Sequence, residues 1–289
     1  MITNQAMLQT GRVTTEGDDL YYEVRGQGQP LVMIPGAGGD ADRYAAVADI
    51  LADEYKVITY DRRATSRSTM NDPQNFEISQ QSRDVVAVRH AAGETSAFVF
   101  GNSSGAVIAL DMAKTQPQAI RAVVAHEPPL ARVHPKAMKW QRFYASVYLT
   151  AFEFGSTLAM LRFLFGTGLP VRQMITARGE TSSSKSSQEP RIGPQVTTDF
   201  LVKQELLPVT NYLPDVEMIK KNGVRVFMAG GKMSLDKKRW YVETAQILAE
   251  KLSCEMVTFP GHHGSYVDMP NEWAATLRSV LHKAGGVNQ

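Results

Sequence analysis

The chain has 289 residues, of which 43% are hydrophobic and 21% charged, and its formal net charge is +2. This length allows one large core domain, or a core domain with an insertion. The small net charge, with basic residues spread along the chain, excludes an electrostatic argument for a nucleic-acid partner or an anionic membrane surface.

Cysteine usage and apolar segments bear on the compartment. Cys254 is the single cysteine, which excludes an intramolecular disulfide and favours a reducing environment. The first residues lack the basic region and apolar core of a secretory signal. The most apolar segment, residues 144–169, is interrupted by charges and glycines, which argues against a membrane span. We expect a cytoplasmic protein, and the sequence is compatible with a homodimer.

The first part of the chain alternates between strand and helix patterns. Short apolar runs predict buried strands, and periodic segments between them predict helices. The strands are expected at residues 20–24, 31–34, 56–60, 97–100 and 120–127, and the helices at 43–51, 78–92 and 106–113. This alternation predicts an α/β fold with a parallel sheet and helices on both faces.

The alternation stops near residue 131 and resumes near residue 216. The segment between holds long helical patterns rich in Met and Phe, no clear strand, and the low-complexity run 181–188, which we expect to be mobile. Strands at 224–229 and 255–259 and helices at 240–252 and from 271 follow. We therefore expect a core of residues 1–130 and 216–289 and a helical cap (lid) at 131–215.

A G-x-S-x-G pattern, Gly101-Asn-Ser-Ser-Gly105, lies between a predicted strand and a predicted helix. This context is typical of a nucleophilic serine on a sharp turn, where flanking side chains would collide with adjacent backbone. Ser103 is the candidate nucleophile. Ser104 is a competitor whose flanking residues fit less well, and a chance glycine-rich turn is the plainer interpretation.

A second motif makes the pattern specific. His263 lies in Pro260-Gly-His-His-Gly264, a glycine-rich turn between the last predicted strand and the last predicted helix. With Ser103 and His263 so placed, the sequence resembles the α/β-hydrolase fold family over residues 18 to 284. The resemblance implies that His263, rather than His262, takes the proton of the serine hydroxyl, which is otherwise a weak nucleophile.

The acid of the implied triad departs from the family's commonest pattern. That pattern places a carboxylate directly after the strand that here ends at Gly231, but Asp236 comes late. Glu127 stands at the other position that the fold allows. In this respect the chain resembles the fungal zearalenone lactone hydrolases, on the motifs Ser103-Ser-Gly105, His126-Glu-Pro-Pro129 and, near the C-terminus, His263 with Tyr266, Val267 and Pro270. We take Glu127 as the acid and Asp236 as the alternative; a structural partner of an arginine or a helix N-terminus is the other interpretation of Glu127.

By the same resemblance, two backbone amides form an oxyanion hole. They are the amides of Ala37, in the loop of residues 35–39, and of Ser104, after the nucleophile. The loop fits neither a phosphate-binding nor a dinucleotide-binding motif, because the required spacing is missing.

Four further polar residues are expected to be structural. Asp61 and Arg63 lie in a polar turn at residues 61–68 that resembles a turn of the family. His126 is expected to point away from Glu127 into the core. Asp268 is expected to cap the last helix.

The implied activity is that of a serine esterase or lactonase with no cofactor and no metal. Several large apolar residues of the predicted cap would favour a hydrophobic ester or lactone, although such a stripe commonly only packs a helix on the core. They are Tyr144, Tyr148, Phe152, Phe154, Met160, Phe163 and Phe165. The same triad would also suit a C–C bond hydrolase, or a lyase or cyclase on a polyketide-like substrate, since fold does not fix the reaction. A ligand receptor without turnover is the third hypothesis.

Overall fold

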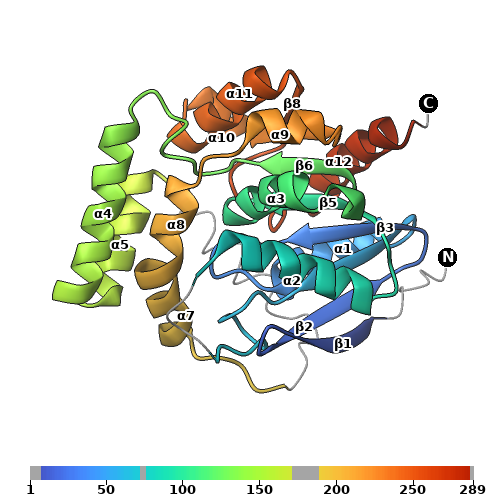
Figure 1. Cartoon of the computed structure of the whole chain (residues 1–289), viewed down its shortest axis with the longest axis horizontal. Helices are drawn as coiled ribbons and strands as arrows, with labels where there is room; N and C mark the ends of the chain where they lie inside the picture. Colours follow the sequence, from blue (N-terminus) through green and yellow to red (C-terminus); the bar gives the residue numbers. More distant parts are fainter. Residues whose placement is uncertain (1–7, 72–75, 171–188, 287–289) are drawn as a thin grey trace.

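The computed structural model describes residues 8–71, 76–170 and 189–286. The run 181–188, expected to be mobile, lies outside these residues. One eight-stranded sheet organises the molecule (Figure 1). Its strands are β1 (Gln9–Thr15), β2 (Asp18–Arg25), β3 (Gln29–Ile34), β4 (Tyr55–Tyr60), β5 (Ala97–Asn102), β6 (Ile120–His126), β7 (Val226–Gly231) and β8 (Glu255–Phe259).

The sheet is mostly parallel, in the order β1-β2-β4-β3-β5-β6-β7-β8. Strands β1 and β2 pair antiparallel, β2 also runs antiparallel to β4, and the remaining neighbours are parallel. The predicted α/β fold is therefore confirmed. Strand β1 was not predicted, because it is an edge strand whose mostly exposed residues lack a regular apolar pattern.

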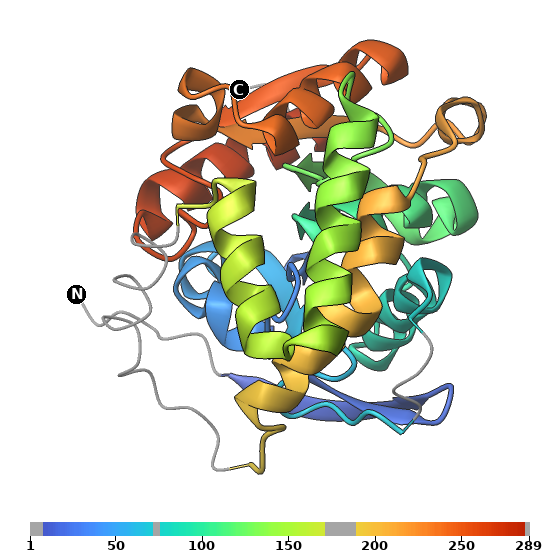
Figure 2. The ribbon, with the colours of Figure 1, turned by 90° about the vertical axis from the view of Figure 1, so that its left-hand side faces the viewer.

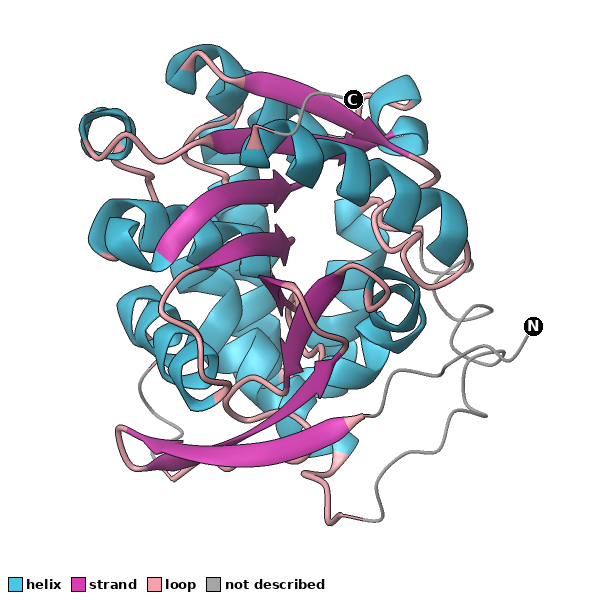
Figure 3. Cartoon of the chain, turned by 90° about the vertical axis from the view of Figure 1, so that its right-hand side faces the viewer, coloured by secondary structure: helices cyan, strands magenta, loops and turns pink. Residues whose placement is uncertain are grey.

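Helices cover both faces of the sheet, as Figure 3 shows. Helices α1 and α12 pack on one face through residues such as Leu51 and Trp273. Helices α2, α3, α9 and α11 pack on the other face through residues such as Val88, Ile108 and Leu248. The bounds are α1 (Ala45–Leu51), α2 (Ile78–Ala91), α3 (Ser104–Thr115), α9 (Val216–Lys221), α10 (Lys232–Asp236), α11 (Trp240–Leu252) and α12 (Pro270–Gly285), with short 3₁₀ turns at Ala41–Tyr44 and Pro117–Ala119.

The central strand β5 and helix α3 are both deeply enclosed in the fold. All six residues of β5 are buried, as expected for a strand covered on both faces. In α3, residues 104–113 are all buried, so this helix is enclosed around its whole circumference. Because both elements are rigid, the turn that joins β5 to α3 holds its side chains in a fixed direction.

Every regular element described between β6 and β7, apart from α9, belongs to a helical layer beside the carboxyl ends of the parallel strands (Figures 1 and 2). The layer consists of α4 (Ala137–Glu153), α5 (Ser156–Thr167), α7 (Pro194–Phe200), a π-helical turn (Leu201–Glu205) and α8 (Leu206–Asn211). Its own cluster of buried residues includes Tyr144 and Leu201 and extends to Trp240 of α11. The helical layer thus packs against the core next to the predicted site.

Candidate active site

Ser103 lies on the turn between β5 and α3, in a strained backbone conformation. Its φ of 56° and ψ of −122° are unusual for a residue with a side chain. Its N–H donates to the carbonyl oxygen of His126 at 2.9 Å, which ties the turn to β6. Among the described residues, the Ser103 hydroxyl forms no hydrogen bond, so it is available to an incoming group.

The two flanking glycines are required by close backbone contacts. A Cβ on Gly101 would lie 2.2 Å from the carbonyl oxygen of Gly105, and a Cβ on Gly105 would lie 2.3 Å from that of Ile34. The steric reason that the sequence pattern suggests is therefore present in the fold.

Gly101→Ala and Gly105→Ala are each expected to lower the free energy of unfolding by about 3 kcal/mol or more, because backbone must move. Gly193→Ala is the matched control, since a Cβ there meets nothing within 4 Å and φ is −62°. Its effect should stay within about 1 kcal/mol in urea unfolding. Equal losses in all three variants would contradict the steric account.

Glu127 and His263 meet beside this turn. Glu127 follows β6 with a φ of 50°, and its side chain is fully buried. Its Oε2 lies 2.5 Å from Nδ1 of His263, and its Oε1 accepts a hydrogen bond from the Gly231 N–H at 2.8 Å. A carboxylate at Nδ1 places the proton on that nitrogen and leaves Nε2 of the imidazole as an acceptor.

The surroundings of Glu127 keep it ionised. Burial acts to raise the pKa of its carboxyl group, but the hydrogen bonds from His263 and Gly231 act in the opposite direction. The opposing contributions prevail, and the pKa lies below its ordinary value. A carboxylate that is charged at neutral pH can stabilise an imidazolium as it forms.

The alternative acid is not brought to the imidazole. Asp236 lies on α10 with its side chain exposed, and its Oδ2 pairs with Nζ of Lys232 at 3.1 Å.

The neighbouring histidine, His262, does not form a hydrogen bond with Glu127. Its Nε2 lies 3.0 Å from Oδ2 of Asp268. The prediction that Asp268 caps the last helix is wrong, because Met269 is the residue before α12 and no side chain caps that end. The short Pro-initiated start of α12 leaves Asp268 one residue too early.

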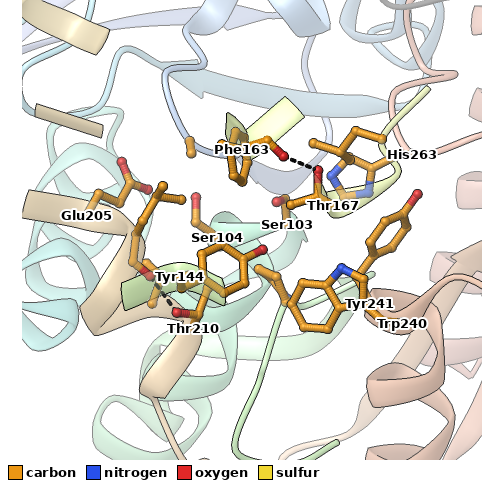
Figure 4. A pocket seen from close by; sticks show the side chains of 15 residues that line it. Ser103, Ser104, Tyr144, Phe163, Thr167, Glu205, Thr210, Trp240, Tyr241 and His263 are labelled. Carbon is orange, nitrogen blue, oxygen red and sulfur yellow. Dashed lines mark hydrogen bonds between the residues drawn. The ribbon is translucent and has the colours of Figure 1, made fainter. Parts of the chain in front are cut away.

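Ser103 and His263 line one cavity (Figure 4). Pro129 and Tyr241 line the same cavity, and the Tyr241 ring packs edge-on against the His263 ring at 4.9 Å. The Ser103 hydroxyl forms no hydrogen bond with the His263 ring in this structure. In enzymes without substrate, such catalytic hydrogen bonds are often long and tighten on binding. The arrangement therefore places an imidazole paired with a carboxylate and a hydroxyl without a hydrogen bond at the same cavity.

Two residues that line the cavity have backbone amides without a hydrogen-bond partner among the described residues. Ala37 and Ser104 line the cavity, and neither N–H donates a hydrogen bond to another described residue. Ser104 is the first residue of α3, where helical geometry leaves the N–H groups without partners. Two free amides beside a hydroxyl are the arrangement that an oxyanion requires.

His126 contacts the residue that precedes Ser103 in the turn. It is fully buried, its Nδ1 lies 2.7 Å from Oδ1 of Asn102, and its Nε2 has no hydrogen bond in the described part of the chain. Burial lowers the pKa of His126 to about 4 despite the nearby charge of Glu127. The ring is therefore neutral at physiological pH.

Acid should destabilise the protein through His126. Its pKa falls from 6.5 to about 4 on folding, so the unfolded chain takes up the proton first as pH falls. Between about pH 7 and about pH 5, this group alone is expected to remove about 2 kcal/mol of the free energy of unfolding. Urea titrations at both pH values should show that the free energy of unfolding falls less in His126→Gln than in the wild type. An unchanged decrease in that variant would contradict the assignment.

The polar turn at residues 61–68 is structural, as expected for two of its members. Asp61 accepts from the Ala41 N–H at 2.9 Å and from Nε of Arg67 at 2.6 Å. Arg63 binds Asp84 through Nε at 2.6 Å. These contacts fix the loop beneath the cavity.

The third arginine of this turn makes a contact that the sequence did not predict. Nη1 of Arg62 lies 2.7 Å from Oε1 of Glu205 and 3.0 Å from Oγ of Ser104, and Glu205 lines the cavity. No local motif marks Glu205; a single carboxylate within an apolar helical stretch is the one signal that the sequence offers.

Of the seven large apolar residues that the sequence places in the cap, only some line the cavity, and Tyr148 and Met160 are half-buried and do not line it. Tyr144 and Phe163 line the cavity, together with Trp240. Phe152, Phe154 and Phe165 are exposed by 60%, 66% and 84%. The remaining lining is mostly apolar, and it includes Thr167, Leu169, Leu206, Val209 and Thr210.

No helix in residues 8–71, 76–170 and 189–286 is long and apolar enough to cross a membrane. In the same ranges, no group of three or more His, Cys, Asp or Glu side chains is arranged to hold a metal ion.

Comparisons with known proteins concern the family and the fold of this chain. The model of the alpha/beta hydrolase fold family matches residues 29–154. The chain is 29% identical over 283 residues to the uncharacterized hydrolase YraK of Bacillus subtilis, covering 96% of this chain and 97% of that protein. It is 32% identical over 123 residues to a zearalenone hydrolase of Cladophialophora bantiana, covering 41% of this chain and 46% of that protein.

The fold also matches solved structures along its whole length. A thermophilic esterase from Thermogutta terrifontis superposes with a TM-score of 0.73 at 16% identity, covering 96% of this chain and 99% of that chain. The family match over residues 29–154 and the shared fold confirm the fold class that the sequence motifs indicate. The chain has the α/β-hydrolase fold.

Proposed function

We propose that this protein with the α/β-hydrolase fold is a serine hydrolase that cleaves hydrophobic esters or lactones. The observation that carries the proposal is the contact of 2.5 Å between buried Glu127 and Nδ1 of His263, at a cavity that the free Ser103 hydroxyl also lines. Such a trio supplies a nucleophile, a base and the group that orients the base.

In the first half-reaction, Oγ of Ser103 attacks the acyl carbon while Nε2 of His263 takes its proton. Glu127 stabilises the resulting imidazolium through Nδ1. The amides of Ala37 and Ser104 bind the negative oxygen of the tetrahedral intermediate. His263 then returns the proton to the leaving alkoxide oxygen, and the acyl group stays on Ser103.

In the second half-reaction, water replaces the alcohol. His263 removes a proton from the water molecule as its oxygen attacks the acyl carbon. The bond to Ser103 breaks, Oγ regains the proton from His263, and a carboxylic acid leaves. A lactone gives one hydroxy acid, because its alcohol and acid belong to the same molecule.

The cavity lining supports a hydrophobic substrate. Tyr144, Phe163 and Trp240 surround the space next to Ser103, and such walls bind apolar groups. We include in the proposal that residues 131–215 act as a cap that supplies part of this wall. The names of the esterase and zearalenone hydrolase relatives support the ester and lactone class.

Pre-steady-state hydrolysis of 4-nitrophenyl esters of short and medium chain length tests the proposal. An acyl-enzyme mechanism gives a burst of nitrophenol close to one equivalent per chain whenever deacylation is the slower step. A burst in the wild type that is absent in Ser103→Ala would support it. Turnover that persists in Ser103→Ala, with an unchanged rate, would contradict it.

A further inference from the structure

One carboxylate in the cavity has no part in the proposed steps. Glu205 lines the same cavity as Ser103 and is only 3% exposed. In Figure 4 it lies on the opposite side of the view from His263, with Ser104 and Ser103 between them. A charged side chain in an otherwise apolar wall is costly unless its oxygen atoms are paired.

One oxygen of Glu205 is firmly held. Nη1 of Arg62 donates to Oε1 at 2.7 Å, and the Arg62 side chain is 2% exposed. Arg62 is itself fixed by the Gln81 side chain, because its Nε donates to Oε1 of Gln81 at 3.0 Å. It also contacts Oγ of Ser104 at 3.0 Å. The guanidinium therefore anchors the carboxylate to the residue next to the nucleophile.

The other oxygen is unpaired. Among residues 8–71, 76–170 and 189–286, no donor forms a hydrogen bond with Oε2 of Glu205. This oxygen is not among the fully buried unpaired atoms of the described residues, so it is accessible and open to a donor. Such an atom in the wall of a ligand cavity is suited to a donor on the bound molecule.

The backbone around Glu205 deviates from a regular helix. Residues Leu201–Glu205 form a π-helical turn between α7 and α8. Such turns alter the direction of the side chains that follow, and they occur frequently at functional sites. Here the turn ends at Glu205, whose partner Arg62 lies 143 positions earlier in the chain.

The donor that fits is neutral. Arg62 and Glu205 already balance one positive and one negative charge, so an ammonium group would add an uncompensated charge to an apolar cavity. A hydroxyl group donates one hydrogen bond without adding charge.

We propose that Oε2 of Glu205 accepts a hydrogen bond from a hydroxyl group of the substrate, and that the enzyme therefore selects hydroxylated esters or lactones. This inference rests on the proposed function, since Ser103 defines where the acyl carbon sits. Glu205 binds the end of the substrate away from His263, and Arg62 holds Glu205 in place.

A matched substrate series tests the selection. The probes are 4-nitrophenyl esters of phenylalkanoic acids with two to five chain carbons, whose ring carries a hydroxyl, a methoxy group or hydrogen. At the best chain length, the wild type should prefer the hydroxyl member by about 10- to 100-fold in kcat/KM, as expected for a hydrogen bond to a charged group. Equal kcat/KM values across the series would overturn the inference.

Glu205→Gln refines the test. Its amide oxygen can still accept from Arg62, but its NH₂ group then faces the ligand and donates instead of accepting. The preference for hydroxyl over methoxy should fall to within about threefold, a residual below one ordinary hydrogen bond. Glu217→Gln is the matched control, because Glu217 is 87% exposed and pairs only with Lys220 among the described residues. It should keep the wild-type preference, and an unchanged preference in Glu205→Gln would contradict the role.

Binding to Ser103→Ala separates this inference from the proposed function. The quenching of tryptophan fluorescence, with Trp240 in the cavity wall, reports binding of the matched phenylalkanoate methyl esters without any reaction. A preference for the hydroxyl ester here supports the inference even if the wild type hydrolyses no ester. Equal affinities for the hydroxyl and methoxy esters would overturn it, whatever the wild type hydrolyses.

Discussion

Ser103→Ala is expected to lower kcat/KM for a hydrolysed ester by about ten-thousandfold or more. The change removes the proposed attacking oxygen but leaves the Glu127–His263 pair and the unpaired amides of Ala37 and Ser104 in place. Those amides would still polarise a bound carbonyl, so a low residual rate above the uncatalysed reaction is expected. Steady-state kinetics with the best 4-nitrophenyl ester provides the measurement.

The stability of the variants shows whether the loss is chemical. Alanine keeps the Cβ at a φ of 56°, so the free energy of unfolding of Ser103→Ala should lie within about 0.5 kcal/mol of the wild-type value. Ser103→Gly removes the Cβ and should be more stable by roughly 1 kcal/mol, because the strain of a positive φ is released. A Ser103→Ala variant that is folded and retains a tenth of the wild-type activity would refute the nucleophile.

Glu127→Gln is expected to have the second largest effect, a decrease in kcat of about a thousandfold to ten-thousandfold. The carboxylate at 2.5 Å from Nδ1 of His263 requires a proton on that nitrogen. A glutamine amide can donate to Nδ1 instead, which moves the proton to Nε2 and leaves the imidazole unable to accept from Ser103. The result is an assembled site with the wrong tautomer.

Asp236→Asn is the matched control for Glu127→Gln. Asp236 is 60% exposed and pairs with Lys232 on the same helix, a kind of surface contact that contributes little to stability. Its activity should stay within about twofold of the wild type, since a screened surface charge has a weak effect on a buried site. A larger decrease in Asp236→Asn than in Glu127→Gln would show that the acid is misassigned.

The sequence predicted those parts of the fold that depend on local rules. The turn at Ser103 could be placed because Gly101 and Gly105 are sterically required on either side of it. The central strands could be placed because they are buried on both faces and therefore read as continuous apolar runs. Strand β1 could not, because pairing with β2, rather than its own composition, holds it at the edge.

Contacts between distant segments were harder to predict. Two positions for the acid were allowed, and only the geometry after β6 brings Glu127 to His263. The pair of Arg62 and Glu205 joins two segments 143 positions apart, so no spacing rule could indicate it. The exposure of Phe165 likewise depends on how α5 is oriented, which helical periodicity leaves open.

Intact-protein mass spectrometry after incubation with a fluorophosphonate probe tests the central claim most directly. The reagent forms a covalent bond only with a serine whose hydroxyl is activated by a neighbouring base. A single adduct on the wild type that is absent from folded Ser103→Ala and strongly reduced in Glu127→Gln is the predicted result. No adduct on folded wild type, or an adduct that persists in Ser103→Ala, would contradict the assignment of Ser103 as the nucleophile.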